Sequence, residues 1–291
     1  MHQYLKAIGF ENQKSKKEIK ELLSEVETSF THHEVIELEP GIDFCEYQKE
    51  YGIDIGIAEY GMAEENGQYE KEYYFPYFKG SGVTSYADII VERRIEKESY
   101  VGICEEIKIG ISLIFHIQNN IEYLKEKQLG NLPKKHTSVT LAGLAQSGVI
   151  LFPVMKDEQQ EQVRKEETRN RMMLLSAARN GDQDAIESLT LEDIDTYSKV
   201  SKRLVTEDVF TIVDTYFMPY GVECDQYSIL GEILEVTTTV NSKTKEALYI
   251  MTLDVNELQF DICVPVAHLM GVPKAGRRFK GNIWLQGTIN F

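Results

Sequence analysis

Hydrophobic and polar positions alternate most regularly at the end of the chain, between Phe279 and Phe291. The odd positions are apolar or glycine, and the even positions are polar except for Trp284. A period of two residues predicts a β-strand with one buried face. The odd face is therefore the expected core face. Trp284, the single tryptophan of the protein, is expected on the outer face.

Similar patterns predict three strands before this one, at Ser228–Thr238, Ala247–Val255 and Leu258–Val264. A short helix is expected at Val266–Met270. Three strands, a helix and a final strand indicate a small β-barrel of the oligonucleotide/oligosaccharide-binding type. Such a barrel needs one more strand. The candidates are Asp214–Gln226 and a segment of another domain.

The first half of the chain predicts an α+β arrangement of mostly antiparallel strands with helices. Ser15 and Glu18 have the spacing of a capping box, which predicts that a helix begins there. Short strands are expected between Glu34 and Ile117, then a helix over Gln118–Gln128. Thr137–Val154 reads as a pair of strands around Gly148.

Residues 156–217 have helical patterns, including a helical hairpin over Leu174–Leu189 that turns at Asn180-Gly181. A new helix is expected to open at Thr190 and another at Thr206. The length of 291 residues is typical of about two domains. We predict an α+β domain over residues 1–155, a helical connector over 156–222 and an OB-like barrel over 223–291.

The chain has a formal net charge of −16, and this charge is unevenly distributed. Residues 1–153 carry −9, residues 154–224 carry −6 and residues 225–291 carry only −1. An acidic surface repels phosphate backbones and anionic membranes, which disfavours binding of duplex DNA by the whole protein. This argument does not apply to the C-terminal region, because its net charge is close to zero.

The four cysteines are far apart and form no CxxC pair, as is typical of a reduced cytosolic protein (Cys45, Cys104, Cys224 and Cys263). The N-terminus lacks the apolar core of a signal peptide, and the longest apolar runs are too short to cross a bilayer. A cytoplasmic location is therefore expected.

Known catalytic and nucleotide-binding patterns, such as GxxxxGK[ST], GxGxxG, HExxH and GxSxG, do not occur in the chain. His32-His33 and Glu105-Glu106 lack the neighbours that a metal site or a carboxylate dyad needs. The sequence therefore predicts no catalytic residue, metal or cofactor.

A basic cluster before the final strand forms the first candidate binding surface. Arg277, Arg278 and Lys280 precede Trp284, and charge beside an aromatic face is the pattern of single-strand binders. One aromatic residue makes a weak platform, whereas tryptophan and arginine are frequent anchors of protein interfaces. The interface interpretation is favoured.

A second candidate surface lies in the segment YYFPYFKGSG, with Tyr73, Tyr74, Tyr77 and Lys79. Aromatic rings beside a basic glycine loop could hold a sugar, a base or a phosphate. The favoured interpretation is a packed edge strand that contains a proline.

Several long stretches resemble one family of proteins. These are AARNGDQDAIESLTLEDIDTYS, TEDVFTIVDTYFMPYGVECDQYSILGEI, GRRFKGNIWLQGTINF and EYYFPYFKGSGV. They are similar to a full-length family of uncharacterised proteins of anaerobic Firmicutes, a domain of unknown function. The resemblance implies a bacterial cytoplasmic protein and supplies no activity, cofactor or functional residue.

Together these patterns favour a non-catalytic binding or assembly protein that uses the barrel as a contact surface, towards a protein partner or a second copy. The alternative is binding of single-stranded nucleic acid or a sugar phosphate through the barrel face around Trp284. An enzyme of another type ranks third.

Overall fold

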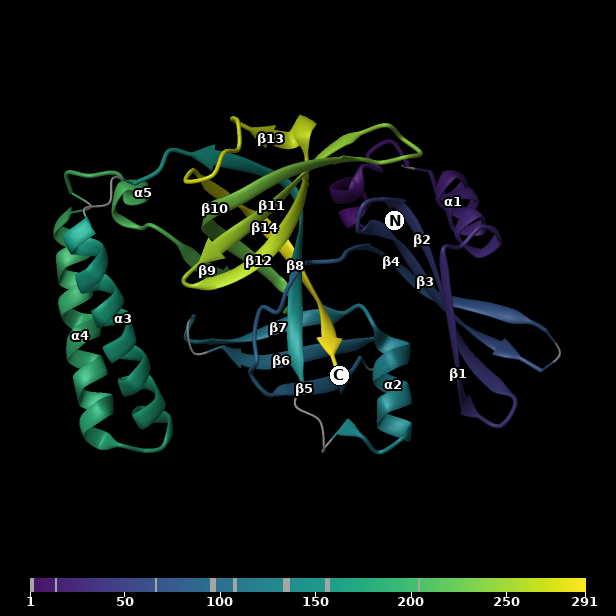
Figure 1. The fold of residues 1–291 in the computed structure, drawn as a ribbon, viewed down its shortest axis with the longest axis horizontal. Helices are drawn as coiled ribbons and strands as arrows, with labels where there is room; N and C mark the ends of the chain where they lie inside the picture. Colours follow the sequence, from purple (N-terminus) through teal and green to yellow (C-terminus); the bar gives the residue numbers. More distant parts are fainter. Residues whose placement is uncertain are drawn as a thin grey trace.

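The computed structural model describes residues 3–13, 15–65, 67–94, 98–106, 109–132, 137–154, 158–203 and 205–291, and it has the predicted α+β class (Figure 1). Four antiparallel strands in chain order form the smaller sheet, here called sheet A. They are β1 (His32–Glu39), β2 (Ile42–Gly52), β3 (Ile55–Glu64) and β4 (Tyr69–Phe78).

A closed five-stranded barrel forms the centre of the molecule. Its strands, in order around the barrel, are β8 (Ser138–Leu151), β12 (Leu258–Pro265), β11 (Ala247–Val255), β10 (Gln226–Val240) and β14 (Arg278–Asn290). The barrel is closed because β14 pairs with β10 along one edge and with β8 along the other. The predicted barrel is thus confirmed, and β8, which lies far upstream in the chain, supplies the missing strand.

Further strands extend the barrel sheet. β7 (Ile111–Ile117) pairs in parallel with the end of β14, and β6 (Tyr100–Glu106) and β5 (Ile89–Arg93) follow it. β9 (Tyr216–Pro219) pairs with β10, and β13 (Leu269–Met270) pairs with β8. The candidate segment Asp214–Gln226 thus adds a short strand without closing the barrel.

The predicted pair of strands around Gly148 is wrong, because β8 runs through this glycine without a turn. The glycine serves a close approach to β14. A Cβ atom at this position would lie 2.2 Å from Cε2 of Phe279 and 3.2 Å from the carbonyl oxygen of Lys280. A glycine inside a strand is thus explained by packing against a neighbouring ring rather than by a change of direction.

The helices agree with the sequence patterns in most places. They are η1 (Gln3–Ile8), α1 (Lys16–Thr28), α2 (Asn120–Gln128), α3 (Glu158–Arg179), α4 (Gln183–Arg203), α5 (Val209–Ile212) and η3 (Val266–His268). The capping box of Ser15 and Glu18 is present. The prediction of a new helix at Thr190 is wrong, because α4 continues through it. The hairpin of α3 and α4 stands apart from the barrel on the side away from sheet A (Figure 1).

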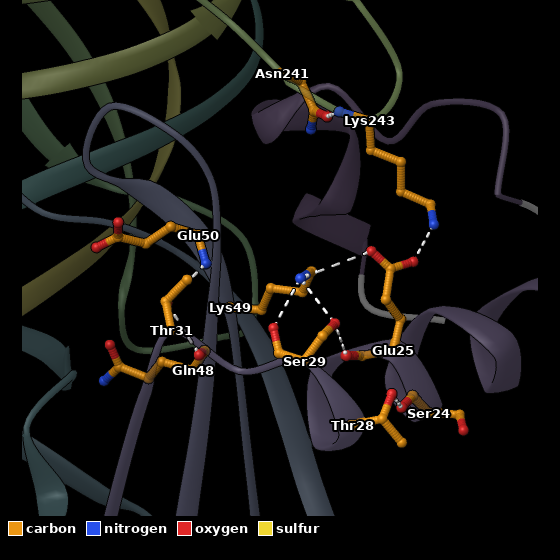
Figure 2. A network of polar contacts seen from close by, with 10 residues as sticks. All are labelled: Ser24, Glu25, Thr28, Ser29, Thr31, Gln48, Lys49, Glu50, Asn241 and Lys243. Carbon is orange, nitrogen blue, oxygen red and sulfur yellow. Dashed lines mark hydrogen bonds and ion pairs between the residues drawn. The ribbon is translucent and has the colours of Figure 1, made fainter.

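Helix α1 covers one face of sheet A and connects it to the barrel. Its four apolar residues at helical spacing are buried: Ile19, Leu22, Leu23 and Val26. Lys49 of β2 donates hydrogen bonds to the carbonyl and hydroxyl oxygens of Ser29 at 2.7 and 2.8 Å. Glu25 pairs with Lys243 of the β10–β11 turn (Figure 2). These contacts fix the position of sheet A beside the barrel.

A buried carboxyl group lies near α1. The side chain of Glu59 is fully buried, and the Lys71 ammonium contacts both Glu59 and Glu27 at 2.7 Å. Burial is the main reason why the pKa of Glu59 is raised to about 8, and the hydrogen bond with Glu27 acts in the same direction. Lys71 acts in the opposite direction.

This pKa predicts that the protein loses stability as the pH rises. Glu59 has an ordinary pKa of 4.5, so the folded state holds a proton that the unfolded state releases between about pH 4.5 and 8. The Glu59→Gln variant has no such proton. Its urea midpoint should fall less between about pH 5 and 8.5 than that of the wild type. The exposed Glu70→Gln variant is the control. Equal pH dependence in both variants would contradict this account.

Candidate functional site

Arg278 is buried at the start of β14 and holds neighbouring segments together. Its guanidinium donates hydrogen bonds of 2.8–3.3 Å to the carbonyl oxygens of Phe152, Phe210, Val213 and Asp214. Loss of solvent on burial lowers the pKa of Arg278. The side chain therefore connects the end of β8 to the chain that returns from the helical hairpin.

Arg277 and Lys280 are partly exposed. The guanidinium of Arg277 lies 5.5 Å from the centre of the Phe152 ring and donates to the carbonyl oxygen of Val272 at 2.8 Å. The Lys280 ammonium lies 4.2 Å from the centre of the Phe210 ring. These cation–π contacts give both cations a preferred position. The structure thus separates the predicted basic cluster into one buried and two accessible cations.

Trp284 lies on the outer face of the barrel, as expected, but it is only 5% exposed because other parts of the chain cover it. Its ring stacks on Tyr4 of η1 at 5.4 Å between centroids and meets Phe75 of β4 edge-on at 6.2 Å. His116 of β7 lies 5.2 Å away. The indole anchors the barrel to other elements of the same chain, and its faces are not open for stacking.

A cleft of about 780 Å³ opens on the barrel face beside Lys280. We call it the barrel-face cleft. Most of its lining side chains are uncharged hydrogen-bonding groups. The lining residues are Gln3, Tyr4, Gln146, Ser147, Gly148, Val149, Tyr220, Gln226, Ser228, His268, Met270, Lys280, Gly281 and Asn282.

A β-bulge gathers these polar groups. The register of β8 against β14 shifts between Gly281 and Ile283, so Gln146 and Ser147 of β8 lie opposite the single residue Asn282. On the other side of β14, Ser228 of β10 pairs with Asn282. Bulges redirect side chains and are frequent beside functional sites. Three neighbouring strands therefore present amide and hydroxyl groups together.

The second candidate surface is largely packed into the protein. Tyr73 and Tyr77 are buried, and the Tyr73 hydroxyl donates to the carbonyl oxygen of Glu98 at 2.8 Å. Tyr74 is half-buried. Lys79 remains partly exposed, with its ammonium 5.2 Å from the centre of the Tyr77 ring and 3.8 Å from Glu50. The four residues thus form no open aromatic surface, but Lys79 borders a second cleft.

This second cleft, of about 540 Å³, lies between sheet A and the barrel, and we call it the seam cleft. Its lining residues are Thr31, His32, Glu34, Glu46, Gln48, Glu50, Lys79, Gly80, Gln118, Asn119, Glu122, Thr140, Thr288 and Asn290. Four of them are glutamates. The two clefts therefore differ sharply in charge.

A buried polar network forms the floor of the seam cleft. Glu46 accepts hydrogen bonds from the Tyr60 hydroxyl and from Nε2 of Gln48, the latter at 2.6 Å. Burial raises the pKa of Glu46 against the opposing effect of the Tyr60 hydrogen bond. Among the described residues, Oε1 of Gln48 has no hydrogen-bond partner. A buried polar group that stays unpaired costs about 1–3 kcal/mol.

Sequence reasoning missed most of these lining residues. Gln146 and Ser147 precede Gly148, which looked like a turn. Glu46, Gln48 and Glu50 lie in a region where only short strands were expected, and the sequence patterns singled out none of the three. Their alternation along β2 places them on one face of the strand, but what covers that face depends on distant strands.

Neither a metal centre nor a membrane span is visible in the described ranges. Across them, no three His, Cys, Asp or Glu side chains are grouped so that they could hold a metal ion. No helix among the described residues combines the length and apolar character needed to cross a bilayer.

The family described as "Domain of unknown function, E. rectale Gene description (DUF3881)" matches residues 5–287 of the chain, which is nearly its full length. This match confirms the resemblance inferred from the sequence. No curated protein and no solved structure gives a significant match.

The contacts of Trp284 predict a structural role that substitution will reveal. Trp284→Ala should lower the free energy of unfolding by about 3–5 kcal/mol, because it leaves a cavity among Tyr4, Phe75 and His116. The exposed neighbour Asn282→Ala should change it by less than about 0.5 kcal/mol. Urea unfolding measures both values. Equal stability of the two variants would show that the indole is not a packed anchor.

Proposed function

We propose that this chain, which belongs to the DUF3881 family, is a non-catalytic binding protein that holds a small phosphorylated sugar or polyol in the barrel-face cleft. The observation that carries the proposal is the β8 bulge, which places Gln146 and Ser147 beside Asn282. Amides and hydroxyls both donate and accept hydrogen bonds. A polyol needs donors and acceptors close together, because each of its hydroxyl groups can do both.

Charge supports an anionic ligand rather than a cation. The chain carries −16 overall, yet none of the described residues that line this cleft is Asp or Glu. Lys280 supplies a positive charge, and the His268 ring contacts Glu11 at 2.7 Å just outside the lining. A lysine ammonium acts as a point charge suited to a phosphate group.

Two other partners fit the cleft less well. Single-stranded nucleic acid is bound by several open aromatic rings, whereas the faces of Trp284 are covered by its own chain. A protein partner needs an apolar, aromatic interface core, whereas this surface is concave and rich in amides. A small ligand therefore agrees best with the shape and chemistry. Tyr220, which is 48% exposed, offers one ring face for the apolar side of a sugar.

Calorimetric titration with a hexose 6-phosphate, the same hexose without phosphate, and inorganic phosphate tests the proposal. The hexose phosphate should bind best, with an affinity that falls as salt is added. Lys280→Ala should weaken its binding about tenfold, equivalent to about 1.4 kcal/mol, because the point charge is lost. Lys274→Ala, which removes an exposed lysine outside the lining, is the matched control.

Two results would contradict the proposal. The first is no detectable binding of any of the three probes. The second is an equal affinity of the Lys280→Ala and Lys274→Ala variants, which would show that only overall charge matters.

A further inference from the structure

Glu46 lies at the floor of the seam cleft, where one of its two oxygen atoms accepts hydrogen bonds from described residues. It is 3% exposed, and both of its hydrogen bonds, from Tyr60 and Gln48, go to Oε1. Neither of these bonds involves Oε2. A carboxyl group buried this deeply is costly unless something pairs with it.

Gln48 adds an unused acceptor next to Glu46. It is 8% exposed, its Nε2 is occupied by Glu46, and its Oε1 has no partner among the described residues. Figure 2 shows the Gln48 and Glu50 side chains on one side of β2, whereas Lys49 points the other way towards α1. Alternate residues of a strand face the same side, so Gln48 shares its face with Glu46.

The amide groups on the other walls are already paired. Gln118 donates to the carbonyl oxygen of Phe78 and to Oε1 of Gln286, both at 2.8 Å, and accepts from Thr288 at 3.1 Å. Asn119 donates to Glu122 at 2.7 Å. The unused capacity of the cleft is therefore concentrated in acceptors, and a ligand that fills it must donate hydrogen bonds.

The charges agree with this requirement. Glu34, Glu46, Glu50 and Glu122 line the cleft, with Lys79 and His32 as the basic lining residues. The Lys125 ammonium lies 2.8 Å from Glu34, which His32 also contacts at 3.1 Å, and Lys79 approaches Glu50 at 3.8 Å. An acidic cleft with unused acceptors favours a cation that carries N–H groups.

We infer that the seam cleft binds a small organic amine as its ammonium ion, with N–H groups donated to Gln48 Oε1 and Glu46 Oε2. A bare metal ion fits less well, because no three acidic or imidazole side chains in the described ranges are grouped to hold one. With its volume of about 540 Å³, the cleft has room for a diamine chain whose second ammonium reaches the glutamates at its rim. This site is independent of the sugar-phosphate proposal, because the two clefts share no lining residue.

Binding of an ammonium ion at Glu46 is coupled to proton release. Burial raises the pKa of Glu46, so part of the free protein holds a proton there that the ligand must displace. Affinity should therefore increase with pH while the amine stays charged. The titratable groups that face the cleft are His32, Glu34, Glu50, Lys79 and Glu122, with Tyr60 beside Glu46. Glu46→Gln separates the contribution of Glu46 from theirs.

The test is calorimetric titration of the full chain with 1,4-diaminobutane, tetramethylammonium and 1,4-butanediol at constant ionic strength. Diaminobutane should bind more tightly than tetramethylammonium, which has charge but no N–H group, and butanediol should not bind. Glu46→Gln and Gln48→Met should each weaken diaminobutane binding about tenfold or more. Glu235→Gln, an exposed carboxylate on β10 outside the lining, should match the wild type.

Urea unfolding of each variant shows whether the variant still folds, so that weaker binding is not confused with loss of structure. Weaker binding in Glu46→Gln and Gln48→Met counts as support when both retain a cooperative transition. If Gln48→Met fails to fold, Glu46→Gln decides alone, because it preserves size and can still accept from Tyr60. Equal binding of diaminobutane and tetramethylammonium, equal losses in Glu46→Gln and Glu235→Gln, or no binding of diaminobutane would each overturn the inference.

Discussion

The pairing of β14 along both of its edges is the constraint on which the rest of the structure depends. One edge is hydrogen-bonded to β10 and then to β7, and the other runs beside β8 for almost the whole strand. Paired edges leave few free backbone groups, which is how a barrel avoids an exposed sheet edge. The same strand therefore closes the barrel and joins it to the extended sheet.

Both faces of β14 are also used. The odd face, which includes Phe279, Ile283 and Leu285, fills the barrel. On the even face, Gln286 accepts from the backbone N–H of Phe78 at 3.2 Å and donates to the carbonyl oxygen of Pro76 at 2.8 Å. Because this buried amide bonds to the backbone of β4, it holds sheet A at a defined place beside the barrel. The seam cleft lies beside this junction, because Gln118, which donates to Gln286, is one of its lining residues.

The sequence predicted the features that depend on near neighbours. The alternation of Phe279–Phe291 gave the last strand and its core face, and Ser15 with Glu18 gave the start of α1. Local sequence patterns could not predict that β8 joins the barrel, because the β8–β12 pairing links Ala142 to Asp261 across more than a hundred residues. For the same reason, the cover that Tyr4 provides for Trp284 was not visible. The seam cleft was missed because alternation along β2 shows which residues share a face but not what lies opposite.

Under the two proposals, the clefts keep two different binding chemistries apart in one acidic chain. One is lined by amides, hydroxyls and Lys280, and the other by four glutamates around the buried Glu46. The central claim is that these clefts select ligands of opposite charge. A crystal structure of the protein grown with a hexose 6-phosphate and 1,4-diaminobutane together tests it most directly. The account predicts phosphate beside Lys280 and an amine nitrogen between Gln48 and Glu46. Both clefts empty, or the ligands exchanged between them, would contradict it.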